Sequence, residues 1–165
     1  MLFSPKHILV PAAVDSEQDL DLAKHSVLVA SDIARKFSSR ITLLHLAPLP
    51  QPGSAALYHS GQIYQAMGKI LQDRLKVDHK KLAELRKAIE DQGISVSTCV
   101  LSDMGDTADF ILASVDKLSA DLLVMSSHGR LGLSKLLFGS VASVVVEKAA
   151  VPVLILHPEA QKGKK

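Results

Sequence analysis

Five short apolar segments alternate with longer segments of helical periodicity, and this alternation constrains the fold more than any other feature. The apolar segments cover residues 7–14, 41–46, 94–101, 121–127 and 151–157. Nearly continuous apolar runs are typical of strands covered by helices on both faces. Residues 94–101 instead alternate apolar and polar side chains, so we expect that strand at a sheet edge. The pattern predicts an α/β protein with a single open parallel five-stranded sheet and helices on both faces.

Four helices are expected between these strands. Ser16 and Asp19 have the spacing of a capping box, and an apolar face follows them as far as Phe37. A long helix is expected over residues 66–91, and Asp106 or Thr107 can cap the next one. The final helix is expected within 140–150, although three consecutive valines there favour a strand on propensity alone. Residues 48–62, rich in proline and glycine, predict a long loop, which is either a functional lid or a disordered insertion.

Length and composition narrow the class of protein. The chain has 165 residues, which suits one domain over 1–158, followed by a flexible basic tail over 159–165. A net charge of +2 and 4% aromatic residues give no support for a nucleic-acid partner. No apolar run approaches the length needed to span a membrane, and the start does not resemble a signal peptide. A single cysteine, Cys99, is compatible with a reducing compartment, so we expect a cytoplasmic protein.

Residues 126–142 connect a buried strand to the last helix and carry the chemistry of an anion site. Gly129 follows the strand, and Gly139 and Ser140 open the helix, where amide groups lack internal partners. Glycines allow an anion to approach those amides, and Arg130 adds positive charge. Neither a Walker A loop nor a G-x-G-x-x-G motif is present, so plain turn chemistry stays the alternative to a phosphate site.

The histidines do not indicate catalysis or metal binding. His128 lies where it could donate to a phosphate, or it could simply be satisfied within a turn. His45 lies inside an apolar strand, which favours a core or supporting role. No pair of histidines has ligand spacing, and no acid–base pair or nucleophile motif is evident, so we expect no metal site and no evident catalyst.

The string VMSSHGRLGLSKLLFGSVASVVVEKAAVPVLIL resembles the carboxyl-terminal signature of the universal stress protein family. In nucleotide-binding members of that family a glycine, nine residues, a glycine and a serine or threonine occur together, as at Gly129, Gly139 and Ser140 here. The resemblance covers nearly the whole chain outside 48–65. It implies a Rossmann-like sheet of the adenine nucleotide alpha hydrolase type, with strand order 3-2-1-4-5.

The resemblance also implies a site for ATP or AMP, with Mg²⁺ as a possible companion. Adenine would lie beside the backbone after the first strand and against one residue of the second. The ribose and phosphates would contact the end of the fourth strand, the glycine-bearing stretch and the last helix. The implied nucleotide-binding residues are Pro11, Ala12, Ala13, Leu46, Met125, Ser126, His128, Gly129, Arg130, Gly139, Ser140 and Val141.

Three positions depart from the family pattern. Ala13 stands where the family often has an aspartate, with Asp15 displaced by two residues; Ser126 replaces a glycine; and Ala142 replaces a hydroxyl residue. Each lost neutral hydrogen bond is worth roughly 0.5–1.5 kcal/mol. Two functions therefore stay open: a nucleotide-binding module acting in stress response or regulation, and an interaction protein of the same fold with an empty site.

The last apolar run, 151–157, predicts a homodimer. It contains no charged residue to protect a sheet edge, and Pro152 protects only its beginning. A second copy pairing across a two-fold axis would cover that edge, as the family resemblance also implies. The alternative is that a loop of the same chain covers it.

Overall fold

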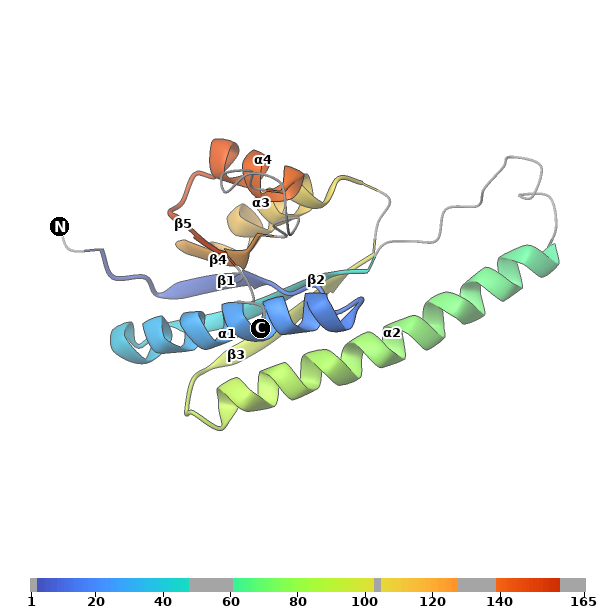
Figure 1. Cartoon of the computed structure of the whole chain (residues 1–165), viewed down its shortest axis with the longest axis horizontal. Helices are drawn as coiled ribbons and strands as arrows, with labels where there is room; N and C mark the ends of the chain where they lie inside the picture. Colours follow the sequence, from blue (N-terminus) through green and yellow to red (C-terminus); the bar gives the residue numbers. More distant parts are fainter. Residues whose placement is uncertain (1–2, 48–60, 103–104, 128–138, 158–165) are drawn as a thin grey trace, which may run out of the picture.

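The five predicted strands form one parallel sheet of order β3-β2-β1-β4-β5 (Figure 1). The strands are β1 (His7–Pro11), β2 (Arg40–Leu46), β3 (Val96–Leu101), β4 (Leu122–Ser126) and β5 (Val153–Leu156). This computed structural model describes residues 3–47, 61–102, 105–127 and 139–157, with side chains from 65 onward in the second range. The predicted fold class and strand order are confirmed, and so is the place of β3 at an edge.

The helices are α1 (Glu17–Phe37), α2 (Gly61–Glu90), α3 (Thr107–Leu118) and α4 (Ser140–Lys148). The capping box of α1 is present: the Asp19 N–H donates to Ser16 Oγ at 3.1 Å, and the Ser16 N–H donates to Asp19 Oδ2 at 3.2 Å. Asp106 caps α3 by accepting from the Ala108 N–H at 2.8 Å. Because α2 begins at Gly61, the last two residues of the predicted 48–62 loop are helical; the others lie outside the described residues.

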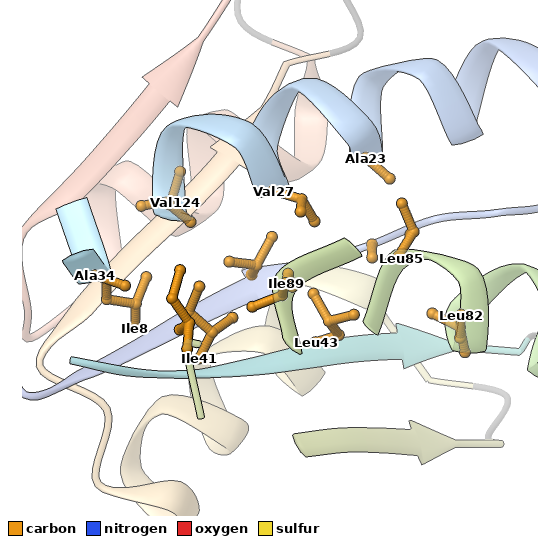
Figure 2. Close-up of a cluster of buried hydrophobic side chains, with 14 of the residues drawn as sticks. Ile8, Ala23, Val27, Ala34, Ile41, Leu43, Leu82, Leu85, Ile89 and Val124 are labelled. Atoms are coloured by element: carbon orange, nitrogen blue, oxygen red, sulfur yellow. The ribbon is translucent and has the colours of Figure 1, made fainter. Parts of the chain in front are cut away.

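Two apolar cores lie on opposite faces of the sheet, because successive strand residues point to opposite sides. Ile8 and Val10 pack with α1 and α2 in one core, whereas Leu9 packs with α3 and α4 in the other. Figure 2 shows part of the first core, where Val27 of α1 and Ile89 of α2 meet the strand side chains. Both faces are therefore covered, as the continuous apolar runs predict.

Four predicted strands are longer than the observed ones. β1 ends at Pro11 instead of residue 14, although Ala12 and Val14 stay buried. β4 covers only Leu122–Ser126 of the predicted 121–127. β3 begins at Val96, with Ile94 buried just before it. β5 covers only Val153–Leu156 of the predicted 151–157. An apolar run in the sequence indicates which residues are buried, and buried residues continue beyond the part of the strand that is paired.

A buried histidine lies at the start of β1, at the edge of the sheet opposite the strand ends. His7 is 4% exposed; its Nε2 lies 2.8 Å from Thr42 Oγ1, and its Nδ1 lies 3.0 Å from the Leu118 carbonyl oxygen. Burial, and then the nearby Arg40 guanidinium, lower the pKa of His7 from its ordinary value of 6.5. The folded protein therefore favours the neutral imidazole.

This histidine predicts acid sensitivity. Below pH 6.5 the unfolded chain takes up a proton at His7 that the folded protein does not, so the free energy of unfolding should decrease as the pH falls from 6.5 toward the lowered folded-state value. Urea unfolding over that range measures the slope. We expect His7→Gln to reduce the slope and His79→Gln, at an exposed position of α2, to keep it. An unreduced slope in His7→Gln would contradict the prediction.

Candidate functional site

A cavity of about 440 Å³ opens at the edge of the sheet where the parallel strands end. The strand ends of β1, β2, β3 and β4 contribute to its wall, together with the first turns of α1, α3 and α4. It lies where the strand order reverses between β1 and β4, with α1 on one face of the sheet and α3 and α4 on the other (Figure 1). Open α/β sheets bind ligands at this position.

Nine of the twelve residues predicted for nucleotide binding line this one cavity. They come from the end of β1, the end of β2, the end of β4 and the start of α4: Pro11, Ala12, Ala13, Leu46, Met125, Ser126, Gly139, Ser140 and Val141. The other three, His128, Gly129 and Arg130, lie outside the described residues. Segments more than a hundred residues apart in sequence therefore meet at one site.

The start of α4 supplies hydrogen-bond donors to the cavity. Gly139 is the N-cap, and within the described part of the chain no side-chain hydrogen bond caps this helix. The Ser143 N–H donates to the Gly139 carbonyl oxygen at 3.0 Å, which begins the helical bonding, so the three earlier N–H groups of α4 have no partner within the helix. Because the first turn lines the cavity, a negatively charged group placed there would meet these donors and the positive end of the helix dipole.

Ser126, which replaces the family glycine, uses its hydroxyl to join β4 to α1. Ser126 Oγ donates to the Leu22 carbonyl oxygen at 3.1 Å and lies 2.8 Å from Ser26 Oγ. Ser26 Oγ also contacts the Leu22 carbonyl oxygen at 3.1 Å. The hydroxyl is thus engaged with the protein at one wall of the cavity, and the added side chain has a structural reason to be there.

Asp15, the acidic residue displaced from the family position, belongs to a polar cluster behind the cavity. Its carboxylate lines the cavity and pairs with the Arg74 guanidinium of α2. Arg74 Nε lies 3.8 Å from Asp78 Oδ2, and that oxygen lies 3.3 Å from His45 Nε2. His45 is fully buried, so the predicted core position is observed, and its other nitrogen lies 2.9 Å from the Ala12 carbonyl oxygen.

The same cluster has ligand atoms close enough to surround a metal ion. One atom each from Asp15, His45 and Asp78 lie within 4.8 Å of one another. However, Arg74 already supplies a cation to both carboxylates. The cluster is therefore best described as an ion-paired network.

Sequence reasoning missed the contribution of two helices to the cavity wall. Leu22, Ala23 and Ser26 of α1, and Thr107 and Phe110 of α3, line the cavity. Their apolar spacing predicts only that they face the core. The signal that could have located them is topological, because a helix that follows a parallel strand begins at the edge where that strand ends.

An open parallel α/β sheet with a cavity at its switch point defines a protein of Rossmann-like fold. The model of the universal stress protein family matches residues 5–157. The chain belongs to the universal stress protein family. Among the helices within the described ranges, none is long and apolar enough to cross a membrane.

Known relatives and solved structures agree with this assignment. Universal stress protein MJ0531 of Methanocaldococcus jannaschii is 28% identical over 157 residues, covering 92% of this chain and 81% of its own length. Stress response protein NhaX of Bacillus subtilis is 27% identical over 151 residues, covering 81% and 90%. Universal stress protein UspA from Lactobacillus plantarum superposes with a TM-score of 0.72 at 18% identity, covering 92% and 97%.

Two further structural neighbours were solved with nucleotides. A universal stress protein from Archaeoglobus fulgidus in complex with dAMP has a TM-score of 0.62 at 20% identity, covering 93% of this chain and 98% of its own. A universal stress protein in complex with cAMP has a TM-score of 0.56 at 21% identity, covering 94% and 98%. At these identities the likeness establishes a shared fold.

Proposed function

We propose that this protein binds an adenine nucleotide, ATP or AMP, in the cavity at the carboxyl ends of the strands. The observation that carries the proposal is that the uncapped start of α4 lines that cavity. The cavity thus combines apolar walls with hydrogen-bond donors for an anion at one end. The nucleotide complexes of related universal stress proteins support the same ligand class. Mg²⁺ would accompany ATP, bound through the phosphates.

We propose an orientation for the nucleotide from the residues that line the cavity. Adenine would lie against Pro11, Ala12 and Ala13, with Leu46 packing on the base. The phosphates would receive hydrogen bonds from the N–H groups at the start of α4. Because this end depends on backbone donors, the departures from the family pattern leave it largely unaffected, whereas Ala13 offers the base no carboxylate.

The biological role we propose is stress response or regulation in the cytoplasm, through nucleotide-dependent conformation or partners.

Two described carboxylate residues line the cavity, and both already interact with other groups of the protein: Asp15 pairs with Arg74, and Asp19 belongs to the capping box of α1. An engaged carboxylate is a poor general base. We therefore propose a binding module instead of a catalyst.

Calorimetric titration of the purified protein tests this function. We expect AMP, and ATP with and without Mg²⁺, to bind and to raise the thermal unfolding temperature, because a ligand that binds only the folded state stabilises it. Mass spectrometry of any small molecule that is released when the purified protein is denatured gives a second measurement. GTP serves as the control for base recognition. The absence of heat, thermal shift and co-purified adenine nucleotide would exclude the proposal.

That negative result would instead favour the second function, an interaction protein with an empty site. The observation on its side is the engagement of polar groups around the cavity. The Ala12 N–H already donates to the Leu44 carbonyl oxygen at 2.8 Å, and the Ser126 hydroxyl is held by Leu22 and Ser26. Because these groups already have partners, they are less available for hydrogen bonds to a nucleotide than unpaired groups would be.

We also propose a homodimer formed through β5. Among the described residues this strand pairs only with β4, it lies at the edge of the sheet, and all four of its residues are half-buried. The carbonyl oxygens of Pro152 and Leu156 face β4, so the polar groups of Val153 and Ile155 face away along the open edge. An apolar edge with free pairing groups recruits another strand.

Light scattering after size exclusion should give twice the chain mass of 17.7 kDa for the wild-type protein. Ile155→Pro removes an outward N–H and should shift the mass to that of one chain, because proline is tolerated on an edge strand but cannot donate. Val77→Ala on α2, an exposed apolar position away from β5, is the control and should remain dimeric. A wild-type monomer at all concentrations would refute the dimer.

A further inference from the structure

The buried imidazole of His45 lies between two hydrogen-bond acceptors. Its Nδ1 is 2.9 Å from the Ala12 carbonyl oxygen, and its Nε2 is 3.3 Å from Asp78 Oδ2. A carbonyl oxygen can only accept, so Nδ1 must carry a hydrogen and donate it. His45 is fully buried and Asp78 is 3% exposed, so water does not separate the groups from one another.

His45 therefore links Ala12 to Asp78 through its two ring nitrogens. The Arg74 guanidinium lies 3.8 Å from the same oxygen of Asp78, so the Asp78 side chain is held from two sides. Removing Asp78 would leave the buried Nε2 of His45 without its partner, which is costly in a protein core.

Three side chains on one face of α2 hold residues 12–15, the segment that follows β1. Arg74, Asp78 and Lys81 are spaced by four and three residues, so they lie on the same face of the helix. Arg74 pairs with Asp15, Asp78 reaches Ala12 through His45, and Lys81 Nζ donates to the Val14 carbonyl oxygen. All three therefore act on residues 12–15.

This segment forms part of the cavity wall. Ala12, Ala13 and Asp15 line the cavity, and the Ala12 N–H is bonded to the Leu44 carbonyl oxygen. With its carbonyl oxygen bonded to His45, Ala12 is held at both polar backbone groups by β2. The position of this wall thus depends on the link from Ala12 through His45 to Asp78.

We infer that His45, held between Ala12 and Asp78, is a positioning residue for the nucleotide site, and that α2 fixes the wall at residues 12–15 through it. This rests on the proposed function only for the identity of the ligand. The buried contacts of His45 join the ligand-facing wall to α2.

Binding of AMP tests the positioning role. We expect Asp78→Ala to weaken AMP about tenfold, because the clamp on Ala12 loses its support. Asp78→Asn, which preserves a hydrogen bond to His45, should weaken AMP by less than about threefold. Asp73→Asn is the matched control on the same helix, since Asp73 is exposed and pairs with Lys76 at 3.3 Å; it should bind like wild type. Circular dichroism and urea unfolding identify the folded variants.

The outcomes separate the two proposals. Wild-type binding together with unchanged affinity in folded Asp78→Ala would overturn the positioning role and leave the nucleotide function standing. A wild-type protein that binds no adenine nucleotide would overturn the nucleotide function and the coupling to it. If Asp78→Ala is unfolded, His45→Asn, which keeps a short donor toward Ala12, takes its place with the same expected weakening and the same overturning result.

Discussion

Replacing Leu9 by alanine should lower the free energy of unfolding by about 2–5 kcal/mol. Leu9 is fully buried in β1, the central strand, which pairs with both β2 and β4. Its side chain packs in the core beneath α3 and α4. The change removes apolar contacts and leaves a cavity that a rigid five-stranded sheet cannot easily close. Urea unfolding at fixed protein concentration measures the difference.

Leu28→Ala is the matched control for this change. Leu28 is 59% exposed on α1, and alanine has at least as good a helix propensity as leucine. The free energy of unfolding of Leu28→Ala should stay within about 0.5 kcal/mol of wild type. Equal losses in the two variants would mean that the core does not lie where the structure puts it.

The sheet could be predicted from the sequence because burial leaves a strong pattern. A strand such as β2, with five consecutive buried residues, must consist of apolar or neutral side chains at those positions. β3 shows the converse: the adjacent residues Ser97 and Thr98 are both exposed on this edge strand, so the observed burial follows the apolar–polar alternation of the sequence only in part. Strand ends were less predictable, because Val14 is fully buried without belonging to a strand.

The last helix shows where local propensity fails as a guide. Three consecutive valines, residues 144–146, favour a strand, yet they lie in α4. Val145 is fully buried against the α3 side of the sheet, whereas Val146 is 47% exposed. The energy of burying one face of a helix exceeds the few tenths of a kcal/mol that separate valine from better helix formers. Tertiary packing decides this element.

The candidate site could be predicted only where a motif or a strand end marked it. Gly139 and Ser140 were identified by their place at a helix start and in a family pattern, and Pro11 by the resemblance to that family. The cluster of Arg74, Asp78 and His45 left no such signal, because Asp78 lies in a long charged helix and differs from its neighbours only by being buried. Its partner His45 is 33 residues away in the sequence, and only the fold brings the two together.

Gly139→Leu should weaken adenine nucleotide binding by at least about a hundredfold, which corresponds to about 2.7 kcal/mol. Gly139 has φ −57° and ψ 158°, a backbone conformation open to any L-residue, so the variant should fold. A leucine side chain at this position would occupy the space in front of the first N–H groups of α4, where the phosphates should bind. Calorimetric titration with AMP and with ATP measures the loss.

Gly68→Leu supplies the matched control for that prediction. Gly68 lies in α2 with open space around the position of an added Cβ, away from the cavity. It receives the same change of side chain and should bind nucleotide with wild-type affinity. If Gly139→Leu also binds like wild type, the phosphates do not lie at the start of α4, and the apolar wall formed by β1, β2 and α1 would have to hold the ligand without them. If both variants lose binding, the effect is not specific to the anion site, so the comparison between the two glycines decides the location.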